Sequence, residues 1–247
     1  MLDAPTLQLP LWSEDHPSES WVLRESRRAR RLAVRVFHSG RVEIVVPPRT
    51  PRAAVEHFIA RHRHWIERKR AAARRDPTHD EPFPPQHCVL VGCDENWQVQ
   101  LAGGTGALRI LVGDRLLRLQ GDCRNLREVR HALRRWLMAH ARQVLGAQLR
   151  RLAQERGFRY ERCIVRRQRT RWGSCSASGT ISLNCCLLFQ RPEVLRYLLV
   201  HELAHTRHMN HSRRFWQCVA EHCADHRALD RELLEGWRRV PSWVFDP

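Results

Sequence analysis

The chain has 247 residues, a formal net charge of +17 at pH 7, and a hydrophobic fraction of 43%. This length allows one large domain or two small ones, and the absence of a run of about 18 apolar residues argues against a membrane span. The N-terminus lacks the basic and apolar regions of a secretory signal. We therefore expect a cytoplasmic protein, whose nine cysteines do not form a disulfide framework.

The basic charge comes almost entirely from arginine, because only Lys69 among the 43 basic residues is a lysine. Such a skew indicates a coding preference for arginine as much as selection for a ligand. A charge of this size permits weak association with nucleic acid through a basic surface, but it identifies no specific site.

The first predicted elements form a small β-rich region with one helix. Residues 1–20 show no periodicity and predict a flexible tail. Alternating apolar residues in 32–46 predict a β-hairpin. A helix follows to about Arg75, with Thr50 as its expected N-cap and Pro51 in its first turn.

A proline-rich and acidic segment at 76–86 predicts a linker, and short strands and a long helix follow it. The helix has Asp122 as a candidate cap and Gly157 as its expected end. His140 lies on its apolar stripe and is expected to be a core histidine. Before the helix, four runs predict a small antiparallel sheet, at 88–91, 97–101, 108–112 and 116–119.

The last part of the chain predicts strand, turn, strand and helix. Strands are expected at 163–167 and 181–189, and Pro192 suits the first turn of the next helix. The segment 180–184 predicts either an edge strand that pairs with an extended peptide or an ordinary core strand.

We therefore expect an α+β protein with an antiparallel, β-rich N-terminal region that contains one helix. A zincin-like helical core with a small sheet follows it. The predicted divisions are a tail at 1–20, the β-rich region at 21–121 and a catalytic domain at 122–247.

The chemistry of the chain centres on the sequence His-Glu-Leu-Ala-His at 201–205. On a helix, His201 and His205 share one face and reach a single zinc ion. Zinc held there would lower the pKa of water, and Glu202 would take a proton from that water and return it to the leaving group. Apolar neighbours place the motif on a buried helix, where these polar side chains would be costly without a partner.

A catalytic zinc site needs a third protein ligand and an open position. The helix is expected to end at Met209–Asn210, which would place His211 in an elbow before a helix capped by Ser212. His211 is the favoured ligand, and Glu221 is the alternative. The full set of candidates contains His208, His211, Glu221 and His222.

Several motifs together resemble the YgjP-like metallopeptidase family, which is similar to the SprT-like and WLM zincin peptidases. They are Trp-Gly-Ser-Cys at 172–175, Leu-Asn at 183–184, the motif at 201–205 and Asn-His-Ser at 210–212. The resemblance implies His201, His205 and His211 as zinc ligands. It also implies Glu202 as the general base, and a peptide or protein as the substrate.

Three functions follow from these patterns. Peptide hydrolysis assisted by zinc is the leading prediction. A metal-dependent hydrolase of nucleotide phosphoanhydrides and a DNA-associated protein with structural zinc are the alternatives. Arg167, Arg169, Arg171 and Tyr197 are candidates for stabilising an oxyanion or binding an anionic substrate.

Overall fold

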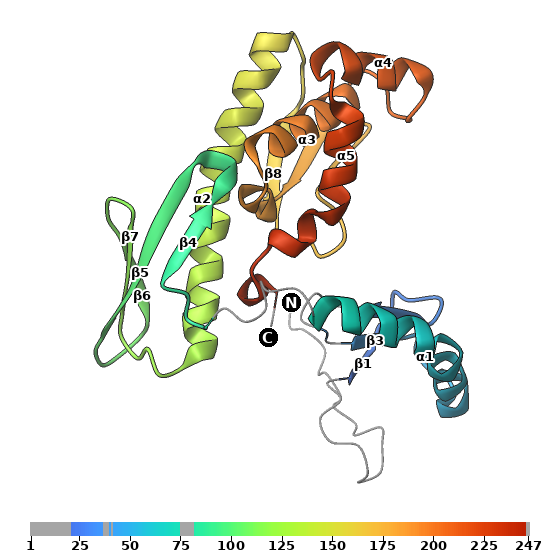
Figure 1. Ribbon diagram of the computed structural model, residues 1–247, viewed down its shortest axis with the longest axis vertical. Coiled ribbons are helices and arrows are strands. Elements are labelled where there is room, and N and C mark those ends of the chain that lie inside the picture. Colours follow the sequence, from blue (N-terminus) through green and yellow to red (C-terminus); the bar gives the residue numbers. More distant parts are fainter. Residues whose placement is uncertain (1–20, 37–39, 41, 75–81, 246–247) are drawn as a thin grey trace. The chain divides into compact units, whose positions relative to one another are not determined.

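The computed structural model describes residues 21–36, 40, 42–74 and 82–245. The chain divides into two compact units, Met1–Asp80 and Glu81–Pro247 (Figure 1). The predicted tail at 1–20 and most of the predicted linker at 76–86 lie outside the described residues. Within the part of the chain that is described, no helix is long and apolar enough to cross a membrane.

The first unit contains a three-stranded sheet, ordered β1-β3-β2, and one helix. Strands β2 and β3 pair antiparallel, which confirms the predicted hairpin. The expectation of a purely antiparallel region is wrong, because β1 pairs parallel with the other edge of β3 and satisfies its backbone groups there. The elements are β1 (Trp21–Glu25), β2 (Ala33–Val36), β3 (Val42–Val46) and α1 (Arg52–Arg74).

Helix α1 turns its apolar face toward the core of this first unit. Val55, Ile59 and Ile66 recur at helical spacing and are buried. Helix α1 begins at Arg52, just after the predicted Pro51, and the Thr50 hydroxyl donates to the carbonyl of Pro47 at 2.8 Å.

The second unit begins with a mixed sheet, ordered β4-β5-β7-β6. The prediction of a fully antiparallel sheet is wrong, because β7 pairs antiparallel with β6 but parallel with β5. The strand bounds are β4 (His87–Leu90), β5 (Glu95–Gly103), β6 (Arg109–Val112) and β7 (Leu116–Gln120), with the 3₁₀ turn η2 (Val91–Cys93) after β4.

Helix α2 (Leu126–Arg156) follows this sheet, and the two share one apolar core. The structure therefore groups the sheet with the helix, whereas the sequence-based division lies between 121 and 122. Asn125 rather than Asp122 caps α2, because its side chain accepts the Glu128 N–H. Gly157 ends the helix in a left-handed conformation, as predicted.

A second small sheet in this unit has the order β8-β10-β9. Strand β10 pairs parallel with β8 and antiparallel with β9, so it is central and its two edges are occupied. The alternative of an ordinary core strand at 180–184 therefore holds, and the edge alternative does not. The strands are β8 (Arg162–Arg166), β9 (Gly173–Cys175) and β10 (Thr180–Asn184).

The predicted strand at 181–189 ends early, because Asn184 turns the chain into the 3₁₀ turn η3 (Cys185–Phe189). The Asn184 side-chain oxygen accepts from the Cys186 N–H at 3.1 Å. Its amide donates to the carbonyls of Gln168 and Arg171 at 2.8 and 2.7 Å. Asn184 thus holds the loop that leads into β9.

Three helices complete the unit, and α3 and α5 lie side by side (Figure 1). Helix α3 ends at Ala204, ahead of the expected end at Met209–Asn210, and the Thr206 hydroxyl donates to the Leu203 carbonyl at 2.7 Å. The described residues therefore form an α+β structure. The remaining elements are α3 (Pro192–Ala204), α4 (Arg213–His222), α5 (His226–Glu235), η4 (Gly236–Arg239) and η5 (Ser242–Val244).

Candidate metal centre

Three histidine side chains converge at the end of α3. His201 and His205 lie one turn apart, and His211 comes from the segment between α3 and α4. One ring nitrogen from each lies within 4.8 Å of the others. The Nε2 atoms of His201 and His211 are 3.2 Å apart. Two nitrogens bound to one tetrahedral zinc ion would be separated by roughly 3.3 Å.

Hydrogen bonding and aromatic packing shape the segment that carries His211. After α3, the Nδ1 atom of His205 lies 3.1 Å from the His208 carbonyl, which closes the turn. Phe215 stacks on the ring of His205, with centroids 4.4 Å apart. Trp216 stacks on His211 at 5.7 Å. The aromatic pair on α4 therefore forms one wall of the cluster.

The surroundings of His201 and His205 favour their neutral imidazole form. Burial, together with the neighbouring His205 and His211, lowers the pKa of His201 to about 3. Burial also lowers the pKa of His205. Neutral imidazole is the form that binds a metal, because its unprotonated nitrogen supplies the lone pair.

Glu202 lies on the same helix and is only 3% exposed. Its Oε2 atom is buried and has no hydrogen-bond partner among the described residues. Burial raises the pKa of Glu202 to about 8. A buried carboxyl group without a partner is costly, and a nearby cation would stabilise its charged form. The three histidine nitrogens fit zinc well, and Glu202 lies next to the first of these histidines in the sequence.

Gly173, at the start of β9, leaves room for the Glu202 side chain. A Cβ atom at position 173 would lie 2.8 Å from Cδ of Glu202 and 2.9 Å from its Cγ. These separations are too short for non-bonded atoms, so any larger residue would displace the carboxylate. The glycine of the Trp-Gly-Ser-Cys motif thus has a direct steric role beside Glu202.

Tyr197 lies four residues before His201 and is fully buried. Its hydroxyl donates to Oδ1 of Asp230 on α5 at 2.7 Å, and its oxygen lies 3.3 Å from Nδ1 of His201. Burial, together with the hydrogen bond and charge of Asp230, raises the pKa of Tyr197. Its proton is therefore directed to Asp230 and not toward an oxyanion. Asp230 carries no sequence signal, because it lies 29 residues after His201 on a separate helix.

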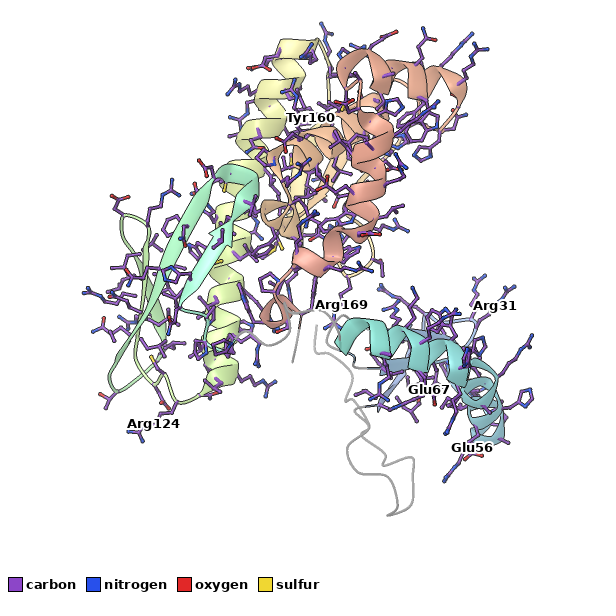
Figure 2. The ribbon with its side chains drawn as sticks, in the orientation of Figure 1. Arg31, Glu56, Glu67, Arg124, Tyr160 and Arg169 are labelled. Atoms are coloured by element: carbon purple, nitrogen blue, oxygen red, sulfur yellow. The ribbon has the colours of Figure 1, made fainter. Side chains whose placement is uncertain are left out.

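Two of the arginines that were candidates for anion binding instead hold the C-terminal segment. Arg167 donates to the carbonyl of Val244, and Arg169 (labelled in Figure 2) donates to that of Phe245. Arg171 is exposed. This structure thus gives Arg167 and Arg169 a packing role.

The other candidate ligands do not join the cluster of three histidines. Among the described residues, the compact groups of potential metal donors do not include His208, Glu221 or His222.

A second compact group contains Cys93, Glu95 and His140. There, His140 Nε2 lies 2.6 Å from Glu95 Oε2. His140 therefore has a partner in the core, as predicted.

Comparison with known proteins places this site in a family. The model of the "YgjP-like, metallopeptidase domain" family matches residues 30–235. No curated protein matches. A solved structure, the metallopeptidase zymogen of Pyrococcus abyssi abylysin, is 23% identical, with a TM-score of 0.34. That match covers 37% of this chain and 92% of the other. Since the family match spans most of the chain, the protein belongs to the YgjP-like metallopeptidase family, as the motifs predicted.

Proposed function

We propose that this protein is a zinc-dependent peptidase with a zincin-like catalytic unit. His201, His205 and His211 are the zinc ligands, and Glu202 is the general base. The convergence of three imidazoles beside a buried carboxylate oxygen without a partner carries the proposal. Membership of a metallopeptidase family supports a peptide or protein as the substrate.

Zinc would act as a Lewis acid toward the scissile carbonyl and would lower the pKa of water. Glu202 accepts a proton from the attacking water as the new C–O bond forms. It then gives that proton to the leaving nitrogen as the C–N bond breaks. Phe215 stacks on His205 and Trp216 stacks on His211, which helps to fix the orientation of these two rings.

The alternatives of nucleotide hydrolysis and DNA association have less support. Nucleotide hydrolysis gains from cations near the metal, yet Arg167 and Arg169 are engaged with backbone carbonyls. A structural zinc site has no use for a base such as Glu202, whose buried oxygen has no partner among the described residues.

Elemental analysis of the purified wild type and His211→Ala tests the ligand set. We expect about one zinc per chain in the wild type and a strong reduction in the variant. Zinc retained in His211→Ala would move the third ligand elsewhere, with Glu221 as the first candidate. No zinc in freshly purified wild type would refute the proposed function.

Glu202→Gln tests the proposed base, because the amide keeps the shape of the side chain and cannot accept a proton. We expect zinc content to be unchanged and peptide hydrolysis to fall by at least about 100-fold. Hydrolysis at the wild-type rate would rule out Glu202 as the base.

A further inference from the structure

The two helix histidines use their Nδ1 atoms in different ways. His205 Nδ1 faces the backbone carbonyl of His208. His201 Nδ1 instead faces the hydroxyl oxygen of a side chain, Tyr197. In both cases Nδ1 faces an oxygen atom outside the cluster, and for His201 it is Nε2 that faces His211.

The Asp230 carboxylate sets the direction of the hydrogen bonds that link it through Tyr197 to His201. A carboxylate accepts hydrogen bonds and does not donate them, so the Tyr197 O–H points to Asp230. The hydroxyl oxygen is then left to accept, and the only donor that His201 can offer at this place is Nδ1–H. This tautomer leaves the lone pair on Nε2, which faces the cluster.

We propose that Asp230, acting through Tyr197, is a positioning residue that sets the tautomer and ring orientation of His201. The inference rests on the proposed function, in which His201 is a zinc ligand. Metal-binding histidines commonly donate their second ring N–H to a carboxylate or carbonyl, and loss of such a partner weakens metal binding. In this chain, a tyrosine hydroxyl stands between the imidazole and the carboxylate.

The location of Asp230 gives helix α5 a part in the site. Helix α5 packs beside α3, and Tyr197 is buried between the residues that it joins. The site therefore depends on a helix that supplies none of the three ligands. A matched control lies two residues away, because Glu232 pairs with Arg191 just before α3 and with Arg239, not with the histidine cluster.

Zinc affinity, measured by competition with a chelator, tests the link to the metal. We expect Tyr197→Phe and Asp230→Ala each to weaken zinc binding by about 10- to 100-fold, and Glu232→Ala to bind like the wild type. The variant that combines Tyr197→Phe with Asp230→Ala should bind zinc no more weakly than Tyr197→Phe alone, because the two groups act in series. Additive losses, or an equal loss in Glu232→Ala, would overturn the inference in favour of general loosening of the helices.

Nitrogen-15 NMR of the metal-free protein tests the tautomer without any metal. We expect His201 to carry its proton on Nδ1 in the wild type and in Glu232→Ala, and to lose this preference in Tyr197→Phe. The same preference in Tyr197→Phe would overturn the inference even if the wild type binds zinc. A wild type that shows the expected tautomer but binds no zinc would refute the proposed function instead.

Discussion

Among the described residues of the second unit, two groups of side chains are compact enough to hold a metal, and they differ in how their polar atoms are satisfied. At Glu95, the Oε2 atom receives hydrogen bonds from Trp97, Arg115 and His140, all within 2.7 Å. At Glu202, the Oε2 atom is buried and lacks a partner among the described residues. In the group that contains Glu95, the carboxylate therefore already has hydrogen-bond and ion-pair partners.

The difference shows that proximity of donor atoms does not define a metal site by itself. A guanidinium group already occupies the place of a cation beside Glu95. Burial, with further contributions from neighbouring acidic groups, also raises the pKa of Cys93 to about 12, which disfavours the thiolate that a metal requires. In the histidine cluster, burial instead lowers the pKa of His201 and of His205, which favours the neutral imidazole that binds a metal.

The largest expected contrast comes from removing one histidine from each group. His201→Ala should reduce zinc from about one per chain to a small fraction of that. His140→Ala should retain all of the zinc and lose stability instead, because Glu95 loses a buried partner. Elemental analysis and thermal denaturation of both variants provide the measurements. Zinc loss in His140→Ala would make the Cys93 group the metal site.

The next prediction distinguishes zinc binding from the action of the proposed base, Glu202. Gly173→Ala should keep zinc but lower peptide hydrolysis by about 100-fold, because the new Cβ displaces the Glu202 carboxylate. Gly146→Ala on α2 is the matched control, since an added Cβ there meets no atom within 4 Å. Equal hydrolysis by the two variants would contradict the steric role of Gly173.

The smallest expected effect concerns the pH dependence of stability. Burial raises the pKa of Glu95, but hydrogen bonds from Arg115 and Trp97, together with His140, outweigh it and lower the pKa overall. The stabilisation is therefore present above the unfolded pKa of about 4.3 and is lost as pH falls through the folded value.

Glu95→Gln tests this dependence. The substitution should lower the free energy of unfolding by about 1–3 kcal/mol at pH 7, and by less as the pH falls below about 4. Urea denaturation of both proteins across this range measures the difference. A constant difference at all pH values would show that the charge of Glu95 does not contribute.

Local patterns predicted the parts of the site that lie close in sequence. Helical spacing brings His201 and His205 to one face, and His211 was expected from an elbow between helices. The structure brings these three together. The elbow starts earlier than predicted, because Thr206 bonds back to the Leu203 carbonyl and ends the regular helix.

Long-range pairing accounts for what the sequence did not reveal. The central place of β10 depends on its parallel pairing with β8, and the intervening β9 occupies its other edge. Asp230 meets Tyr197 only because α5 packs on α3. Paired residues of β8 and β10 are 18 residues apart in the sequence, and Tyr197 and Asp230 are 33 residues apart. Contacts over such separations leave no periodic pattern in the sequence.

The anchoring of the C-terminal segment has a consequence for the order in which the protein matures. Arg134 on α2 donates to the carbonyl of Trp243, 109 residues later, and Arg167 donates to Val244. Because the three histidines precede both Asp230 and this segment in the sequence, they leave the ribosome first. A nascent chain would thus present the three proposed ligands before the helix that carries Asp230, and we expect it to bind zinc more weakly until α5 has been made.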